Sequence, residues 1–129
     1  MKINLRITAV LGMLTIILGA FGAHALKEKL GVDALQNFQT GVRYQMYHVI
    51  VLLFINTYAG FSNAVKNRIS ILFFMGILFF SGSIYAITAG GIDPKSIWFI
   101  TPLGGLLFIV GWLLMAISFF KRNSNISIE

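Results

Sequence analysis

Long apolar runs alternate with short polar segments along the whole chain. The runs cover residues 5–25, 42–61, 69–89 and 97–120. Each is about 20 residues or longer, enough to cross roughly 30 Å of hydrocarbon as a helix that rises 1.5 Å per residue. A segment inside lipid must satisfy its own backbone hydrogen bonds, so each run is predicted to be helical. The pattern therefore predicts an all-α integral membrane protein, a compact bundle of four transmembrane helices in a single domain over residues 1–129.

The segment between the first two runs is the longest of the polar connections. Asp33 and Gln36 have the spacing of a helix-capping box, and apolar positions follow at helical spacing. Residues 33–40 are therefore predicted to form a short interfacial helix that bends at Gly41 into the second span.

Glycine and proline mark the boundaries of the last two runs. Gly90 and Gly91 are expected to end the third span, and Asp93 before Pro94 has the pattern of an N-cap followed by proline at the first helical position. Pro102 lies inside the fourth run, where proline is expected to kink the helix.

Small residues recur at helical spacing on three of the runs. Such residues let helix backbones approach closely in lipid, so these stripes are predicted to be packing faces. The first span carries the narrow stripe Thr8, Gly12, Thr15, Gly19, Gly22 and Ala23. The later spans carry Gly82, Ala86 and Gly90, and then Gly104 and Gly111.

Composition agrees with a membrane protein, and charge predicts how it is oriented. The chain is 57% hydrophobic and only 11% charged, against about 25% charged residues in soluble domains. With no cysteine, disulfides and thiolate metal sites are excluded. The net charge of +6 is assigned to loop charges that fix orientation and not to nucleic-acid binding. Both termini are predicted to be cytoplasmic, because the N-terminus, the second loop and the C-terminus carry Lys2, Arg6, Lys66, Arg68, Lys121 and Arg122.

Polar side chains within the runs gather toward the predicted outer face of the membrane. Shallow polar groups at one level are the arrangement expected of a ligand site. The candidate ligand-binding residues are Arg43, His48, Tyr44, Tyr47, His24, Ser81, Tyr85 and Thr101. His24 lies about 140° around its helix from the small-residue stripe, so the sequence leaves open whether it faces the others. The alternative interpretation is a hydrogen-bonded cap that only holds the first two spans together.

The chemistry available to these residues is narrow. No Asp or Glu lies inside an apolar run, so an acid that could orient a serine–histidine pair is missing, and so is an intramembrane carboxylate relay. Two histidines 24 residues apart lack the spacing of a zinc site. We therefore expect no catalytic residue, no metal and no cofactor, although axial ligation of haem by His24 and His48 remains a weaker alternative.

Four segments carry a resemblance to a known family. They are GAFGAHAL (19–26), TGVRYQMYH (40–48), FSGSIY (80–85) and ITPLGGLLFIVGW (100–112). Together they resemble the uncharacterised membrane family called domain of unknown function 423, which is similar to eukaryotic transmembrane protein 256. The resemblance covers all four runs and implies an uncleaved four-span protein of the plasma (inner) membrane. It supplies no catalytic or binding residue.

The sequence thus favours a non-enzymatic accessory protein. Its expected partners are membrane lipid, and alternatively a membrane protein or further copies of the chain, bound through the Arg/His/Tyr group at the outer leaflet. A second interpretation is a small transporter or channel with a polar lumen lined by Arg43, His48, Ser81, Tyr85 and Thr101. A third is a haem or quinone redox module.

Overall fold

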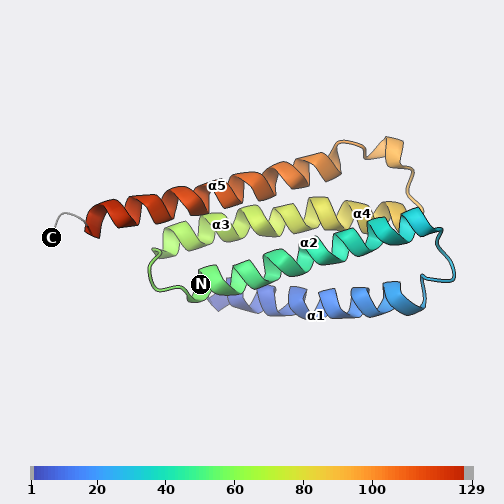
Figure 1. Cartoon of the computed structure of the whole chain (residues 1–129), viewed down its shortest axis with the longest axis horizontal. Coiled ribbons are helices and arrows are strands. Elements are labelled where there is room, and N and C mark those ends of the chain that lie inside the picture. The colour runs from blue at the N-terminus through green and yellow to red at the C-terminus, as the bar shows by residue number, and fades with distance from the viewer. Residues whose placement is uncertain (1, 127–129) are drawn as a thin grey trace.

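The computed structural model describes residues 2–126 as helices joined by short connections, with no strand among them. Side chains are described as far as residue 122. The helices are α1 (Lys2–His24), α2 (Val32–Thr57), α3 (Asn63–Gly76), the π-helical turn η1 (Ile77–Ser81), α4 (Gly82–Thr88), the 3-10 turn η2 (Pro94–Ser96) and α5 (Ile100–Ile126). Because α3, η1 and α4 follow one another without a break, they form one continuous rod, called here the α3–α4 rod (Figure 1).

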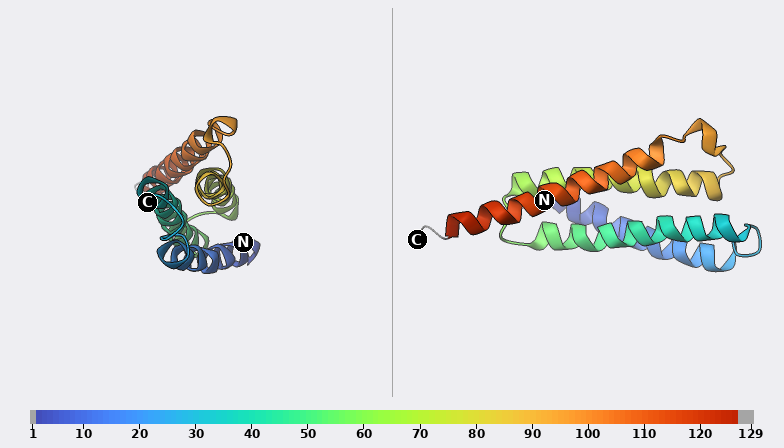
Figure 2. Two further views of the ribbon diagram at one scale, coloured as in Figure 1. Left: turned by 90° about the vertical axis from the view of Figure 1, so that its right-hand side faces the viewer. Right: turned by 45° about the horizontal axis from the view of Figure 1, so that its top comes forward.

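Neighbouring helices run antiparallel along their length. Gly12 and Gly22 of α1 lie against Val49 and Phe38 of α2, so the two helices pass each other in opposite directions. The α3–α4 rod then runs in the same direction as α1, and α5 returns beside it (Figure 1). Seen end-on, α1 and α5 lie at opposite edges of the molecule (Figure 2). As a result α1 packs chiefly on α2, while α5 packs chiefly on the α3–α4 rod.

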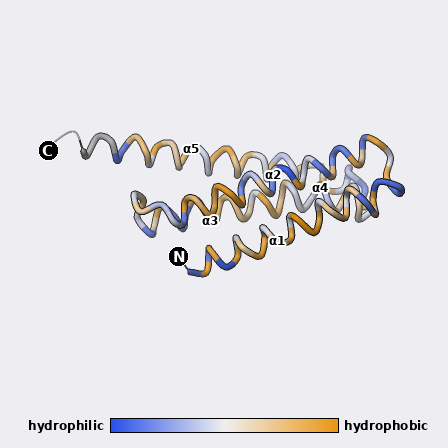
Figure 3. The backbone as a smooth tube through the Cα atoms, turned by 60° about the horizontal axis from the view of Figure 1, so that its bottom comes forward, coloured by the Kyte–Doolittle hydropathy of each residue, from blue (hydrophilic) through white to orange (hydrophobic). Residues whose placement is uncertain are grey.

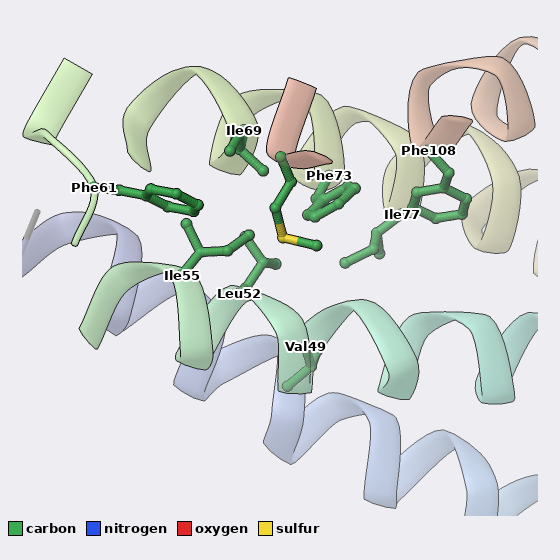
Figure 4. Close-up of a cluster of buried hydrophobic side chains, with 9 residues drawn as sticks. Val49, Leu52, Ile55, Phe61, Ile69, Phe73, Ile77 and Phe108 are labelled. Carbon is green, nitrogen blue, oxygen red and sulfur yellow. The ribbon is translucent and has the colours of Figure 1, made fainter. Parts of the chain in front are cut away.

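The buried core lies between α2, the α3–α4 rod and α5. It consists of large apolar side chains, several with no exposed surface, and Figure 4 shows the aliphatic and aromatic groups of facing helices in contact. Its buried members are Val49, Leu52, Ile55, Phe61, Ile69, Phe73, Ile77, Phe108 and Met115. Glycines allow this close packing, because a Cβ on Gly76 would lie 2.4 Å from the Phe108 ring, and one on Gly111 would lie 2.5 Å from the Phe73 ring.

The predicted signals at Gly91 and Asp93 end and begin helices, whereas α2 begins after Gly31 with no side-chain cap from the predicted Asp33–Gln36 box. The Ser62 hydroxyl accepts a hydrogen bond from Val65 N at the start of α3. The Asp93 carboxylate accepts one from Lys95 N, and Pro94 occupies the first position of η2. Gly91 has a φ of +69°, the left-handed conformation that glycine adopts without strain after a helix.

Two expectations about the backbone are wrong. Residues 33–40 are not a separate interfacial helix, because they form the first turns of a continuous α2. Gly41 provides close packing and not a bend, since a Cβ there would lie 2.9 Å from the Tyr85 ring. Pro102 does not kink the last span, because α5 begins only at Ile100. In the first turn of a helix, a missing N–H breaks no intrahelical hydrogen bond.

Within residues 2–126, three helical segments are long and apolar enough to cross a membrane. They are Lys2–His24, Asn63–Thr88 and Ile100–Arg122. Most of their surface faces outward and is apolar, with such side chains as Ile16, Leu78 and Ile109 more than half exposed. Helix α2 carries many polar residues in its first half, and hydrophilic positions gather toward that end of the molecule (Figure 3).

The predicted small-residue faces are confirmed on α1 and α5 but not on the α3–α4 rod. Gly12, Gly19 and Gly22 all face side chains of α2, and Gly104 lies against the backbone of Phe80. Gly82 has room for a side chain, because the nearest atoms to a Cβ there are 3.9 and 4.0 Å away.

Candidate functional site

His48 of α2 is buried and packs against side chains of α3 and α5. Its Nδ1–H donates to the Tyr44 carbonyl oxygen at 2.7 Å, and its Nε2 accepts from the Trp112 indole N–H at 3.1 Å. A carbonyl only accepts and an indole N–H only donates, so these bonds define the neutral Nδ1–H tautomer. The imidazole also stacks on Phe108, with 3.6 Å between ring centroids. Both ring nitrogens are therefore used inside the protein.

Ser81 and Tyr85 join the α3–α4 rod to α2. The Ser81 hydroxyl, with no exposed surface, donates to the Gly41 carbonyl oxygen at 2.7 Å. The Tyr85 hydroxyl donates to Oε1 of Gln45 at 2.8 Å, and the Gln45 amide Nε2 donates to the Leu11 carbonyl oxygen of α1 at 3.1 Å. These hydrogen bonds connect α1, α2 and the α3–α4 rod.

Thr101 pairs with Ser83 across the contact between α4 and α5. Their hydroxyl oxygens are 2.5 Å apart, and the Ser83 hydroxyl also donates to the Phe80 carbonyl oxygen at 3.0 Å. Because Ser83 has only one hydroxyl proton, the Thr101 O–H is the donor between the two. Thr101 also borders a shallow pocket of about 250 Å³.

Arg43, Tyr44 and Tyr47 lie on the opposite, exposed face of α2. The Arg43 guanidinium donates to the Thr40 hydroxyl at 3.1 Å, and it borders a cavity of about 230 Å³ together with Gly19 of α1. The two tyrosines are 41% and 53% exposed and contact each other edge to face. No carboxylate pairs with Arg43 among the described residues.

His24 does not join either group. It is the last residue of α1 and is exposed, whereas His48 is buried between other helices. This exposure agrees with the sequence pattern, which places His24 about 140° around the helix from the small-residue packing stripe of the first span. No cluster of three or more histidine, cysteine, aspartate or glutamate residues that could hold a metal ion occurs in the described part of the chain.

The eight predicted residues therefore separate into two sets with different chemistry. His48, Ser81, Tyr85 and Thr101 use their polar atoms to bond helix to helix, an arrangement that does not support an open lumen lined by them. Binding haem iron through His48 would require breaking one of its two hydrogen bonds. The exposed set, centred on Arg43, is the one with a polar group available to a ligand.

Sequence reasoning missed several polar partners that complete these contacts, among them the buried Gln45 and Trp112, which is 43% exposed. Gln45 and Trp112 supply partners for Tyr85 and His48. The signal for Gln45 is an amide within an apolar run, four residues after Gly41 and three before His48, which places it on the buried face of α2. A second polar cluster lies near the other end of the molecule and contains Asn4, Asn56, Asn67 and Ser70.

Comparison with known proteins gives a family but no activity. The family model described as protein of unknown function DUF423 matches residues 18–105. A UPF0382 membrane protein of Staphylococcus saprophyticus is 42% identical over 94% of this chain and 99% of its own length. The UPF0382 inner membrane protein YgdD of Escherichia coli K12 is 36% identical over 99% of this chain and 98% of its own length. No solved structure matches the chain. This chain therefore belongs to the DUF423 family of membrane proteins, whose function is unknown.

Proposed function

We propose that this protein is a non-enzymatic accessory protein of the membrane that binds the anionic headgroup of a lipid through Arg43. The observation that carries the proposal is an exposed guanidinium, bonded only to a neutral hydroxyl, beside a cavity between α1 and α2. A guanidinium presents planar donors that match the oxygens of a phosphate. A lipid phosphate would supply the negative charge that no described residue places beside Arg43.

The depth of Arg43 supports a lipid as the source of that phosphate. Val42 contacts Gly19 of α1, so Arg43 lies nearly level with Gly19. Helix α1 ends five residues later at His24, about 7.5 Å further along its axis. A long basic side chain near the end of a span extends its charge toward the headgroups while its stem stays in the apolar layer. The exposed Tyr44 and Tyr47 beside it are residues enriched at membrane interfaces.

The proposal includes four crossings of the membrane and a defined orientation. Helix α1 and the α3–α4 rod point in the same direction, and α2 connects the end of the first to the start of the second. Because two successive spans in the same direction require the chain to return through the membrane between them, α2 crosses the membrane as well. The polar residues of its first half, such as Asp33, Gln36 and Asn37, are mostly exposed, and the apolar run that would cross the hydrocarbon follows them. The positive-inside rule then puts both termini in the cytoplasm and the Arg43 end at the outer leaflet of the plasma (inner) membrane. The name of the Escherichia coli relative, an inner membrane protein, supports that location.

The test compares lipid binding by the intact chain with Arg43 present or replaced. The protein and its Arg43→Gln variant are reconstituted in nanodiscs containing phosphatidylglycerol and phosphatidylcholine, and retained lipid is measured by native mass spectrometry. One basic residue near a membrane surface contributes about 1 kcal/mol of attraction to anionic lipid, which corresponds to about fivefold. We expect phosphatidylglycerol retention to fall by about that factor in Arg43→Gln.

Arg68→Gln is the matched control. Arg68 is also exposed but belongs to α3 at the opposite end of the molecule, so its loss removes the same charge from a different place. Equal lipid retention in the wild type and Arg43→Gln would contradict the proposal. Retention of a second copy or of another protein, lost specifically in Arg43→Gln, would show that the exposed face binds protein and not lipid.

A further inference from the structure

An apolar groove of about 370 Å³ lies between α1 and the α3–α4 rod, apart from the Arg43 face. Leucine and isoleucine side chains of α1 form one wall, and the rod forms the other. Leu14 and Leu78 on these two walls are 39% and 59% exposed, so the groove opens toward the hydrocarbon of the membrane. Its volume is within the range of small-molecule sites in proteins.

The groove contains one buried polar side chain, Gln45 of α2, which is 3% exposed. Its Nε2 donates to the Leu11 carbonyl oxygen, and its Oε1 accepts from the Tyr85 hydroxyl. The Leu11 carbonyl only accepts, so the amide can have only this orientation. An amide nitrogen carries two protons, and the structure gives a partner to one of them. The second N–H is a buried donor whose hydrogen-bonding capacity is unused among the described residues.

The position of Gln45 along the membrane normal limits what can satisfy that donor. Leu11, its partner, is nine residues from the start of α1 and thirteen from its end, about 14 Å and 20 Å along the axis. The amide therefore lies near the middle of the apolar layer, where neither water nor a lipid headgroup reaches. Acyl chains at this depth have no acceptor to offer. A molecule that bonds to Gln45 must itself be soluble in hydrocarbon.

Gly82 keeps the groove open on the side of the rod. It follows the π-helical turn Ile77–Ser81, a feature that is frequent at functional sites in helices. A Cβ on Gly82 would touch nothing closer than 3.9 Å, so this glycine does not serve close helix packing as Gly104 does. The missing side chain leaves space beside Leu78 and Tyr85.

We infer that this groove binds a lipid-soluble molecule in which a carbonyl group is attached to an apolar body, the class to which quinones belong. The carbonyl oxygen accepts the second N–H of Gln45, and the apolar body lies against the leucine side chains of α1. Satisfying a buried amide donor in hydrocarbon favours such a ligand over the surrounding acyl chains. The inference concerns binding alone and is independent of the Arg43 site.

The test uses decyl-ubiquinone as the probe and the full chain in phosphatidylcholine nanodiscs. A photoreactive analogue carrying a diazirine on its tail is cross-linked to the protein, and the labelled residues are mapped by mass spectrometry. Labelling is expected on α1 and on residues 78–85, and unmodified decyl-ubiquinone is expected to compete. Gly82→Leu fills the groove and is expected to reduce competable labelling at least tenfold. Gln45→Leu, which removes the donor, is expected to reduce it at least fivefold.

Four controls make the outcome decisive. Gly82→Ala keeps the groove open and should retain labelling. Tyr47→Phe removes a tyrosine hydroxyl that does not border the groove, so it should retain labelling as well. An alkane of equal length without a carbonyl should not compete. Equal competition by that alkane would overturn the inference, because it would show occupation by acyl chains only. Unchanged labelling in Gly82→Leu, in protein with wild-type helix content, would overturn it as well. Arg43→Gln should leave labelling unchanged, which separates this site from lipid binding at Arg43.

Discussion

At the scale of single residues, the glycines on and against the α3–α4 rod show that the same residue type serves different purposes at different contacts. A Cβ on Gly104 of α5 would lie 2.2 Å from the Phe80 backbone nitrogen, and backbone atoms cannot move aside easily. A Cβ on Gly82 of α4 would meet only ordinary contacts. The first glycine is required for helix approach, whereas the second is required by nothing in the packing.

This difference predicts opposite effects of the same substitution. Gly104→Ala should lower the free energy of unfolding by about 1–3 kcal/mol, because it forces α5 away from the rod. Gly82→Ala should leave it unchanged or raise it by up to about 1 kcal/mol, because alanine has the higher helix propensity. Unfolding of both variants in mixed detergent micelles, followed by circular dichroism, gives the comparison. A loss in Gly104→Ala below about 0.5 kcal/mol would show that the contact is looser than described, and a loss in Gly82→Ala equal to that of Gly104→Ala would show that Gly82 is tightly packed.

His48 illustrates how a residue that suggests a ligand can have its polar atoms bonded within the protein. A histidine within an apolar run is a reasonable candidate for binding, because polar groups in membranes are often functional. Here the imidazole meets a backbone carbonyl, an indole N–H and the Phe108 ring, so its polar and aromatic surfaces are all in use. Nothing in the sequence pairs it with Trp112, which is 64 residues away.

At the scale of helices, α2 is the element that holds the others together. Its buried face bonds to α1 through Gln45, to the rod through Gly41 and to α5 through His48. Its exposed face carries Arg43 and the two tyrosines. Helix α2 is therefore less apolar than its neighbours for two reasons: some of its polar residues bond to other helices, and others lie on its exposed face.

A second set of bonds joins three helices near the cytoplasmic end of the proposed topology. Asn56 of α2 accepts from the Asn4 amide of α1 at 3.2 Å and donates to Ser70 of α3 at 2.8 Å. All three side chains are buried. One amide thus connects helices that are distant in sequence.

Replacing that amide should weaken the association of α1 and α3 with α2. Interhelical hydrogen bonds in membranes contribute about 0.6 kcal/mol on average and up to about 1.7 kcal/mol. Asn56→Leu keeps the side-chain size but breaks two such bonds, so we expect a loss of about 1–3 kcal/mol in the same unfolding assay. Asn37→Leu, at an exposed position of the same helix, should change stability by less than about 0.5 kcal/mol. A loss no greater than that of the control would argue against a stabilising role for the cluster.

At the scale of the whole molecule, six of the ten basic residues lie at one end. The start of α1, the connection between α2 and α3, and the last turns of α5 lie at that end (Figure 1). Arg122 donates to the Tyr58 hydroxyl and lies over its ring, which ties α5 to the end of α2. The other end carries the exposed Trp98 beside Phe99.

This distribution leads to a direct test of the four-span arrangement. The chain has no cysteine, so single cysteines report position without background. In intact cells, Asp33→Cys should react with a membrane-impermeant maleimide. Asn63→Cys should react only after the membrane is opened, because it begins α3 at the opposite end. Labelling of both from outside, or of Asp33→Cys only after opening, would contradict the proposed crossings or their orientation.

The sequence by itself determined the class of this protein and much of its helical framework. Apolar runs long enough to cross a membrane, the helix cap at Asp93 and the glycine at Gly91 are local properties, and each produces its effect within a few residues. That is why the helical class and the packing faces of α1 and α5 were predictable. The misplaced bend at Gly41 and kink at Pro102 both came from locating a helix boundary by composition alone.

Only the tertiary structure decided which polar residues are available to a ligand. Whether a side chain is satisfied depends on partners from other helices, such as Trp112 for His48 and Gly41 for Ser81, and helical periodicity gives a direction but no distance. The same limit hid the groove beside Gln45, which exists because α1 packs on α2 and leaves the rod partly uncovered. In a membrane, where every buried donor needs an acceptor, those long-range contacts separate the residues that build the protein from those that can bind something else.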